Sequence, residues 1–182
     1  WSAFRTRVAA YRAARKAGAD GSMARRLQDM RKEARRDALR WMGQSLLRRV
    51  STEDGFRERL TAFWADHFTA VGKGPLLHAG TAPYVEEAIR PHVAGDFAGM
   101  LRAVATAPMM LRYLDQARSV GPNSPAGRKR GRGGANENLA REMLELHTLG
   151  LSGGYDQTDV TELAHLLTGL SVTAEGGFTY RA

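Results

Sequence analysis

The feature that most constrains the fold is a long helical pattern that begins after Ser22. Apolar residues recur there at steps of three and four, namely Met23, Leu27, Met30, Ala34, Ala38 and Trp41. Because this spacing gathers side chains on one face of an α-helix, it predicts a helix from Ser22 to about Val50. A broad aromatic stripe then predicts a second helix over 52–69, with a cap at Ser51 or Thr52 and Asp54 in the first turn.

Glycine and proline divide the rest of the chain into shorter pieces. Residues 71–80 hold three glycines and a proline, which predicts a loop. Short helices are expected from Thr81 to Pro91, after a cap at Asp96, and over 109–114.

Two later segments complete the expected fold. Residues 119–134 lose periodicity and are rich in glycine and arginine, which predicts an exposed, mobile loop. Phe178 to Ala182 have the pattern of a strand. We therefore expect one all-α domain over residues 1–182, a multi-helix bundle with a short C-terminal β strand or hairpin. Because residue 1 is Trp and the strand is cut short, we expect a fragment of a longer chain.

Composition excludes several kinds of site and places the charge at one end. There is no cysteine, so a metal ion would need His, carboxylate or water ligands, and no run approaches the ~20 apolar residues of a membrane span. The net charge is +8, and residues 1–50 hold 14 Lys and Arg against 4 Asp and Glu. A basic face of this kind suits nucleic acid, anionic lipid or an acidic protein, or is only a solvated helix face. No aromatic residues alternate with the arginines as in proteins that bind single-stranded nucleic acid, so nucleic acid is the least favoured of these partners.

The candidate site is a polar helix between Asn136 and Gly150. Asn136 suits an N-cap and Gly150 a left-handed C-cap. At about 100° per residue, Asn138, Glu142 and Glu145 share one arc, opposite the apolar one. Two close carboxylates could bind a divalent metal ion or act as an acid and base pair.

Other interpretations of the same residues are structural. Glu137, Arg141 and Glu145 are spaced i, i+4, i+8, as in a surface ion-pair ladder. His147 falls on the apolar side, where we expect a buried histidine that is hydrogen-bonded near the helix C-terminus and readily protonated.

Several polar residues outside this helix also allow a structural or a functional interpretation. His67 lies among aromatic residues and is either a core histidine or a third ligand beside Glu142 and Glu145. Asp159 and Glu162 fit a capping box. Glu162 and His165 match one copy of a di-iron motif that requires two copies, so no di-iron site is expected.

The chain resembles the large bacterial family known as domain of unknown function 1800. The matching blocks are residues 57–60, 63–64, 67–68, 136–138, 140–142, 145–150, 154–155, 159–160, 162–164 and 167–169. The resemblance implies a mainly helical protein whose pattern continues past residue 182, often exported or periplasmic, with a sulfatase-like partner protein. It implies no particular activity.

Two functions are expected first for such a chain, and nucleic-acid binding by its basic N-terminal face is the third. The first is a hydrolase-like or metal-assisted enzyme of the envelope, with Glu142, Glu145 and His67 as ligands or as acid and base, and with Asn138 and Arg141 as binding residues. The alternative is a scaffold or partner-binding module, in which Arg141 is paired within the fold and the basic N-terminal face recruits the partner.

Overall fold

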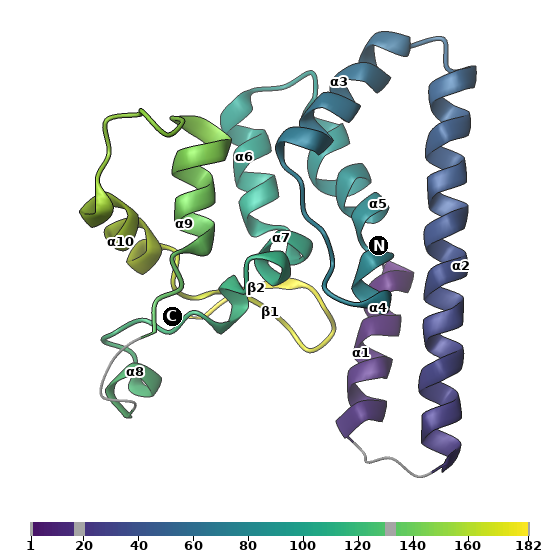
Figure 1. Cartoon of the computed structure of the whole chain (residues 1–182), viewed down its shortest axis with the longest axis horizontal. Helices are drawn as coiled ribbons and strands as arrows, with labels where there is room; N and C mark the ends of the chain where they lie inside the picture. Colours follow the sequence, from purple (N-terminus) through teal and green to yellow (C-terminus); the bar gives the residue numbers. More distant parts are fainter. Residues whose placement is uncertain (1, 17–20, 130–133, 182) are drawn as a thin grey trace.

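The computed structural model describes residues 2–16, 21–129 and 134–181, and within them the chain is mainly helical (Figure 1). The α-helices are α1 (Ser2–Lys16), α2 (Gly21–Ser51), α3 (Gly55–His67), α4 (Pro75–His78), α5 (Thr81–Tyr84), α6 (Phe97–Thr106), α7 (Pro108–Tyr113), α8 (Pro125–Lys129), α9 (Asn138–Glu142) and α10 (Gln157–Leu166). Two π-helical segments, η1 (Val85–Ile89) and η4 (Met143–Thr148), and two 3₁₀ turns, η2 (Arg90–His92) and η3 (Gln116–Arg118), continue or join them.

A two-stranded hairpin closes the described chain. β1 (Leu170–Val172) pairs antiparallel with β2 (Phe178–Tyr180), with Ser171 opposite Thr179. The prediction of a mainly helical fold with a short C-terminal hairpin is therefore confirmed. None of the described helices has the length and apolar character needed to cross a bilayer.

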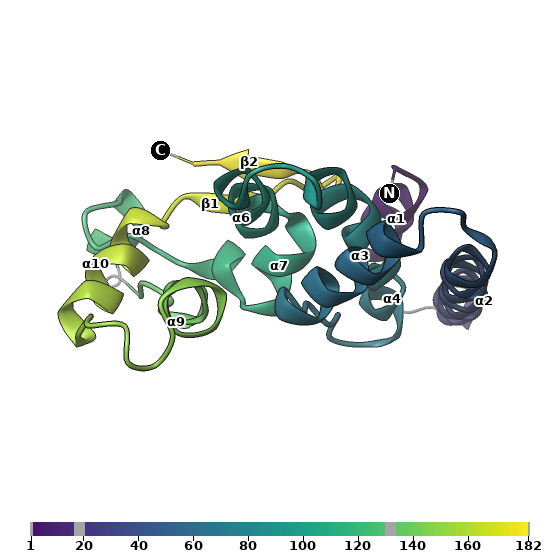
Figure 2. The same cartoon turned by 90° about the horizontal axis from the view of Figure 1, so that it is seen from above.

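The elements form an elongated arrangement with α2 along one edge (Figure 2). α1 lies beside α2, α6 and α7 occupy the centre, and α9 and α10 lie at the far end (Figure 1). The hairpin packs against α7. The candidate polar helix and the basic α2 thus lie at opposite ends of the molecule.

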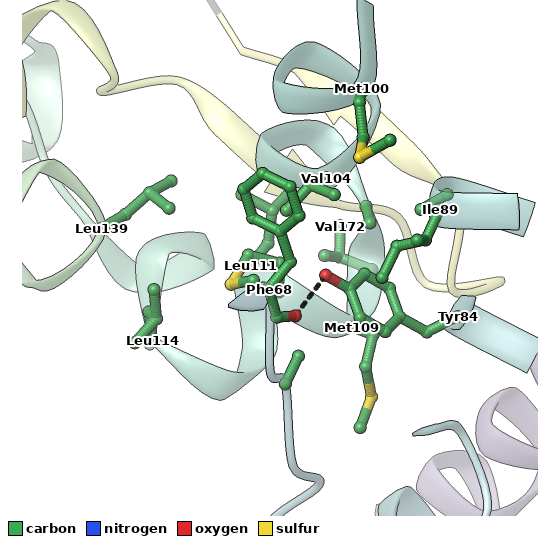
Figure 3. Close-up of a cluster of buried hydrophobic side chains, with 14 of the residues drawn as sticks. Phe68, Tyr84, Ile89, Met100, Val104, Met109, Leu111, Leu114, Leu139 and Val172 are labelled. Atoms are coloured by element: carbon green, nitrogen blue, oxygen red, sulfur yellow. Dashed lines mark hydrogen bonds between the residues drawn. The ribbon is translucent and has the colours of Figure 1, made fainter. Parts of the chain in front are cut away.

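The main core gathers the apolar faces of the central helices around Phe68 (Figure 3). Phe68, Ile89, Met110 and Leu139 are fully buried. Tyr84 donates its hydroxyl to the carbonyl oxygen of Phe68 at 2.8 Å. This hydrogen bond satisfies a buried carbonyl beyond the end of α3, so it fixes where the chain leaves that helix.

A second, smaller core attaches α2 to its neighbours. Ala34 of α2 is buried with Val8 of α1 and Ala79, and Trp41 packs against the same cluster. Ala34 and Trp41 belong to the apolar stripe in the sequence, so that stripe is the buried face of α2. The extent of α2 also agrees with the prediction.

Local boundaries differ from the predictions where turn chemistry decides them. Asp96 caps α6 as expected, and its carboxylate accepts from the Gly99 amide at 2.7 Å. For α3 the expected cap was wrong, because Asp54 itself is the N-cap and accepts from Arg57 N at 3.0 Å. The predicted loop over 71–80 contains the single turn α4, which Pro75 begins.

The segment 119–134 is only partly an irregular loop. α8 lies within it, and residues 130–133 fall outside the described part of the chain. The mobility expected for this segment stays a prediction.

An ion-pair network joins α2, α3 and the η1–η2 segment. Arg90 donates to both carboxylate oxygens of Glu58, at 2.6 and 2.8 Å. Glu86 lies 2.9 Å from Arg90 Nε and also accepts from Arg48 of α2 at 2.7 Å. Hydrogen bonding to Arg90 lowers the pKa of the Glu58 carboxyl and outweighs the opposing effect of burial. The bidentate pair is therefore charged inside the fold.

We predict that Glu58→Gln lowers the free energy of unfolding by about 2 kcal/mol or more, because it leaves the half-buried Arg90 without its main counter-charge. The matched control is Glu137→Gln in a more exposed ion pair, for which we expect a clearly smaller loss. Urea denaturation at pH 7 measures both values. Equal losses for the two variants would contradict this account.

Candidate functional site

The polar helix ends at Gly150 as predicted, but the predicted cap at Asn136 was wrong, because Glu137 occupies the N-cap position and makes no side-chain cap bond. α9 starts at Asn138, and the Asn136 side chain accepts from Asn138 N at 3.0 Å. The Asn136 side chain also donates to the carbonyl oxygen of Leu114 at 2.7 Å, which ties the helix start to the end of α7. Gly150 has φ of 80°, the left-handed conformation expected after a helix.

Arg141 is paired within the fold, and the ladder interpretation is confirmed. Its guanidinium donates to Glu145 at 3.0 Å, to Glu137 at 3.1 Å and to Gln157 of α10 at 2.9 Å. Glu137 also accepts from Gln157 at 3.0 Å and from Thr161 at 3.1 Å. These bonds from Gln157 and Thr161, with a smaller effect of Arg141, lower the pKa of Glu137. The ladder thus connects α9 and η4 with α10.

Glu142 stands apart from this network. Its side chain is partly buried and makes no hydrogen bond or ion pair with any residue in the described part of the chain. Burial, followed by the charge of Glu145, raises the pKa of the Glu142 carboxyl. Of the two carboxylates predicted to share an arc, Glu145 is a structural partner of Arg141, and Glu142 has no described partner.

Beyond Glu142 the helix widens to the π form, which the sequence did not predict. The i→i+5 bonding of η4 rotates its residues relative to a regular α-helix, so the arcs drawn at 100° per residue do not hold beyond Glu142. Such bulges often occur at functional sites.

His147 is buried in η4, as predicted, with only 4% of its surface exposed. Its Nδ1 atom is buried and has no hydrogen-bond partner among the described residues. Burial, followed by the charge of His67, lowers the pKa of His147 from 6.5 to about 4. The expectation of a readily protonated imidazole was wrong, because the helix dipole supplies only about 1 kcal/mol and desolvation outweighs it.

His67 faces His147 across the packing between α3 and η4. Its Nε2 lies 3.3 Å from the carbonyl oxygen of His147, and the two rings are 6.1 Å apart. It also makes edge contacts with the rings of Trp64 and Phe68. The described contacts of His67 are therefore those of a histidine in an aromatic cluster.

The residues proposed as metal ligands are not seen as a ready-made set. No described hydrogen bond or ion pair joins His67 to Glu142 or Glu145. Within residues 2–16, 21–129 and 134–181, no group of three or more His, Asp and Glu side chains could hold a metal ion. Asn138, proposed with Arg141 as a binding residue, is exposed, and its side-chain Nδ2 donates to the Leu114 carbonyl oxygen at 3.4 Å. Roles for these residues in catalysis or binding stay predictions.

The helix after the polar segment starts at a different cap from the one predicted. Asp156 is the N-cap of α10, and Asp159 completes a capping box with it. Asp159 had been expected to cap the helix with Glu162. Glu162 is instead exposed, and its carboxylate lies 3.8 Å from Nδ1 of the partly buried His165 on the same helix face.

Sequence reasoning overlooked a second surface, on α2. Leu39, Met42, Leu46 and Val50 are each more than half exposed and point away from the helix face that holds the buried Ala34 and the partly buried Trp41. Their spacing of three, four and four residues is visible in the sequence, but the other apolar stripe of α2 also fits a helix. Only packing shows which stripe is covered.

Comparison with known proteins identifies a family and nothing closer. The family model described as "Protein of unknown function (DUF1800)" matches residues 2–182. No curated protein and no solved structure matches the chain.

The buried His147 predicts a pH-dependent stability. The unfolded chain binds a proton at His147 near pH 6.5 and the folded chain only near pH 4, so this contribution is complete above pH 6.5 and is lost as the pH falls toward 4. The loss is on the order of 3 kcal/mol. Urea denaturation between pH 7.5 and 4.5 should show a steeper decline for the wild type than for His147→Leu. The control at a more exposed histidine, His165→Gln, should follow the wild type, and identical slopes in all three proteins would refute the assignment.

Glu142 predicts the opposite behaviour. Because its folded pKa is raised, ionisation destabilises the fold above about pH 4.5, and protonation relieves this. Glu142→Gln should therefore unfold at the same or a higher temperature than the wild type at pH 7, with the difference vanishing at pH 4. Glu145→Gln, which removes a partner of Arg141, should lower the melting temperature. A clear destabilisation by Glu142→Gln at pH 7 would show that Glu142 has a partner after all.

Proposed function

We propose that this chain, which belongs to the family described as "Protein of unknown function (DUF1800)", is a helical module that recruits an acidic partner helix on the outer face of α2. The observation that carries the proposal is the unpartnered apolar stripe on that face. α2 lies at the edge of the molecule in both views of the fold (Figures 1 and 2), so a partner can reach the stripe without displacing other helices.

The stripe has the geometry of a helix-binding surface. At about 100° per residue, Leu39, Leu46 and Val50 lie within about 40° of one another, and Met42 adjoins them. All four are more than half exposed. Exposed apolar residues that line up along one helix face favour the docking of an amphipathic helix. The apolar side chains of such a helix, spaced three and four residues apart, would pack against them.

Charge determines which partner fits. The same face continues toward the start of α2 as Lys32, Arg35 and Arg36, all exposed. Arg35 and Arg36 form no ion pair with a described residue. Over its whole length α2 holds nine Arg and Lys against three Asp and Glu. A partner helix with acidic residues at one end and apolar residues at the other complements this surface, and the charge would speed its association.

The polar helix supports the same interpretation of the protein as a scaffold. Arg141, the cation expected to bind a ligand in an enzyme, is already occupied by Glu137, Glu145 and Gln157. The ladder therefore favours a role in holding α9, η4 and α10 together. The sulfatase-like protein implied by the family resemblance is the first partner to examine.

A second candidate function is acid and base chemistry at Glu142, with or without a divalent metal ion. It is favoured by the raised pKa of Glu142 and by the absence of a partner for its side chain in the described residues. In that case metal analysis of the purified protein and of Glu142→Gln should differ, or hydrolysis of a sulfate or phosphate ester should be lost in the variant. Identical metal content and identical hydrolysis would remove this candidate.

The docking proposal predicts which variants lose the partner. Binding of the sulfatase-like protein, measured by titration calorimetry, should weaken steeply with added salt and be abolished by the combined variant R25E, R26E, R35E and R36E. Leu39→Gln with Leu46→Gln should weaken it at least tenfold.

The matched control is R57E with R59E on the exposed side of α3, which should bind as the wild type does. Circular dichroism should show the same helix content in all variants, since none of these side chains is buried. If the wild type does not bind, or if the α2 variants bind as tightly as the control, the proposal is wrong.

A further inference from the structure

A cavity of about 620 Å³ lies between the N-terminal helices and the centre of the molecule. α1, α2 and α4 contribute to one side of it, and α7, η3 and β1 to the other. In Figure 1, α7 and the hairpin lie to the left of α1 and α4, and α2 lies along the right edge. The volume falls within the ~300–1,000 Å³ typical of small-molecule sites. The lining residues belong neither to the polar helix nor to the exposed stripe of α2.

The lining of this cavity is strongly cationic. Asp115 is the one carboxylate among the described lining residues, and it lies 2.5 Å from Lys73 Nζ. The cationic lining residues are Arg31, Lys73, Arg112, Arg118 and Arg181. Apart from Lys73, none of them forms an ion pair with a described residue. The cavity thus concentrates a positive charge that the described part of the protein leaves uncompensated.

Two polar groups of the lining are buried without partners. The hydroxyl of Ser171 has no hydrogen bond to a described residue, although only 3% of this residue is exposed. The Nη2 atom of Arg112 is likewise buried and unpartnered. Such atoms are rare in folded proteins, because a buried donor without an acceptor loses its hydrogen bonds to water and forms none within the protein, which destabilises the fold. Both residues line the same cavity, so a small movement of either side chain would bring its unpartnered donor to an acceptor-rich ligand there.

From these observations we infer that the cavity binds an organic phosphate. Arginine guanidinium groups pair with phosphate oxygens through two parallel hydrogen bonds, and the Ser171 hydroxyl supplies a further donor. Val8, Leu77 and Val172 add apolar surface to the lining. The ligand therefore carries an apolar body as well as the anion.

The excess of charge selects a phosphate over a sulfate ester or a carboxylate. A phosphate monoester carries about −1.5 to −2 at pH 7, whereas the other two carry a single charge. Four uncompensated cations stabilise the second negative charge, and the same argument makes binding stronger above the second phosphate pKa of about 6.

Titration calorimetry of the whole chain with phenyl phosphate, phenyl sulfate and inorganic phosphate tests this inference. Phenyl phosphate should bind at least tenfold more tightly than phenyl sulfate, which has a similar shape, and more tightly than inorganic phosphate. Its affinity should rise between pH 5.5 and pH 7.5. Equal affinity for phenyl phosphate and phenyl sulfate, or no binding of either, would overturn the proposal.

Variants locate the site. Arg112→Met should lower the affinity for phenyl phosphate at least tenfold. Arg102 is an exposed arginine of α6 outside the cavity, so Arg102→Met should leave this affinity unchanged. Ser171→Ala should weaken binding several-fold while leaving the melting temperature of the free protein equal or higher, since it removes a buried hydroxyl without a partner. If Arg112→Met fails to fold, Ser171→Ala decides alone. Unchanged affinity in Ser171→Ala would then refute the site.

Discussion

The bidentate contact between Arg90 and Glu58 is the interaction on which the positions of the N-terminal helices depend. Apolar packing is non-directional, so it brings α2, α3 and the η1–η2 segment together without fixing how they meet. Arg90 donates two hydrogen bonds to Glu58, which requires a carboxylate placed to match its planar guanidinium group, and Glu86 extends the contact to Arg48 of α2. A buried pair of this kind adds little stability over apolar residues of the same shape. Removing one partner is destabilising, however, because it leaves the other charge buried without a counter-charge. The network therefore acts mainly by excluding other arrangements.

The same distinction between satisfied and unsatisfied groups separates structure from function elsewhere in the molecule. Arg141 lies in the polar helix that the sequence singled out, and it donates to Glu137 and Glu145, the two carboxylates of its ladder. It also donates to Gln157, so it connects η4 with α10. Glu142 and the Ser171 hydroxyl have no partners within the described chain, and the apolar stripe on the outer face of α2 is more than half exposed. Polar or apolar groups left in this state are where a ligand or a partner can gain free energy by binding, and the proposed functions rest on them.

The sequence predicted what local spacing controls. α2, the Asp96 cap, the Arg141 ladder and the left-handed Gly150 all follow from residues within about eight positions of one another. It did not predict η4, because an i→i+5 helix has no distinctive residue pattern. Nor did it single out Glu58, which stands in a charged run, since its partner Arg90 lies 32 residues away. The cationic cavity was missed for the same reason, because its lining comes from both ends of the chain.

A double-mutant cycle on Glu58 and Arg90 tests the central claim most directly. Glu58→Gln, Arg90→Met and the combined variant would be unfolded in urea at pH 7, and the coupling free energy is the part of the double loss that the single losses do not explain. If the pair fixes the joint between the helices, the coupling is about 2 kcal/mol or more, and the double variant loses less stability than the single losses added together. A coupling below about 0.5 kcal/mol, as for a solvent-exposed pair, would contradict the account.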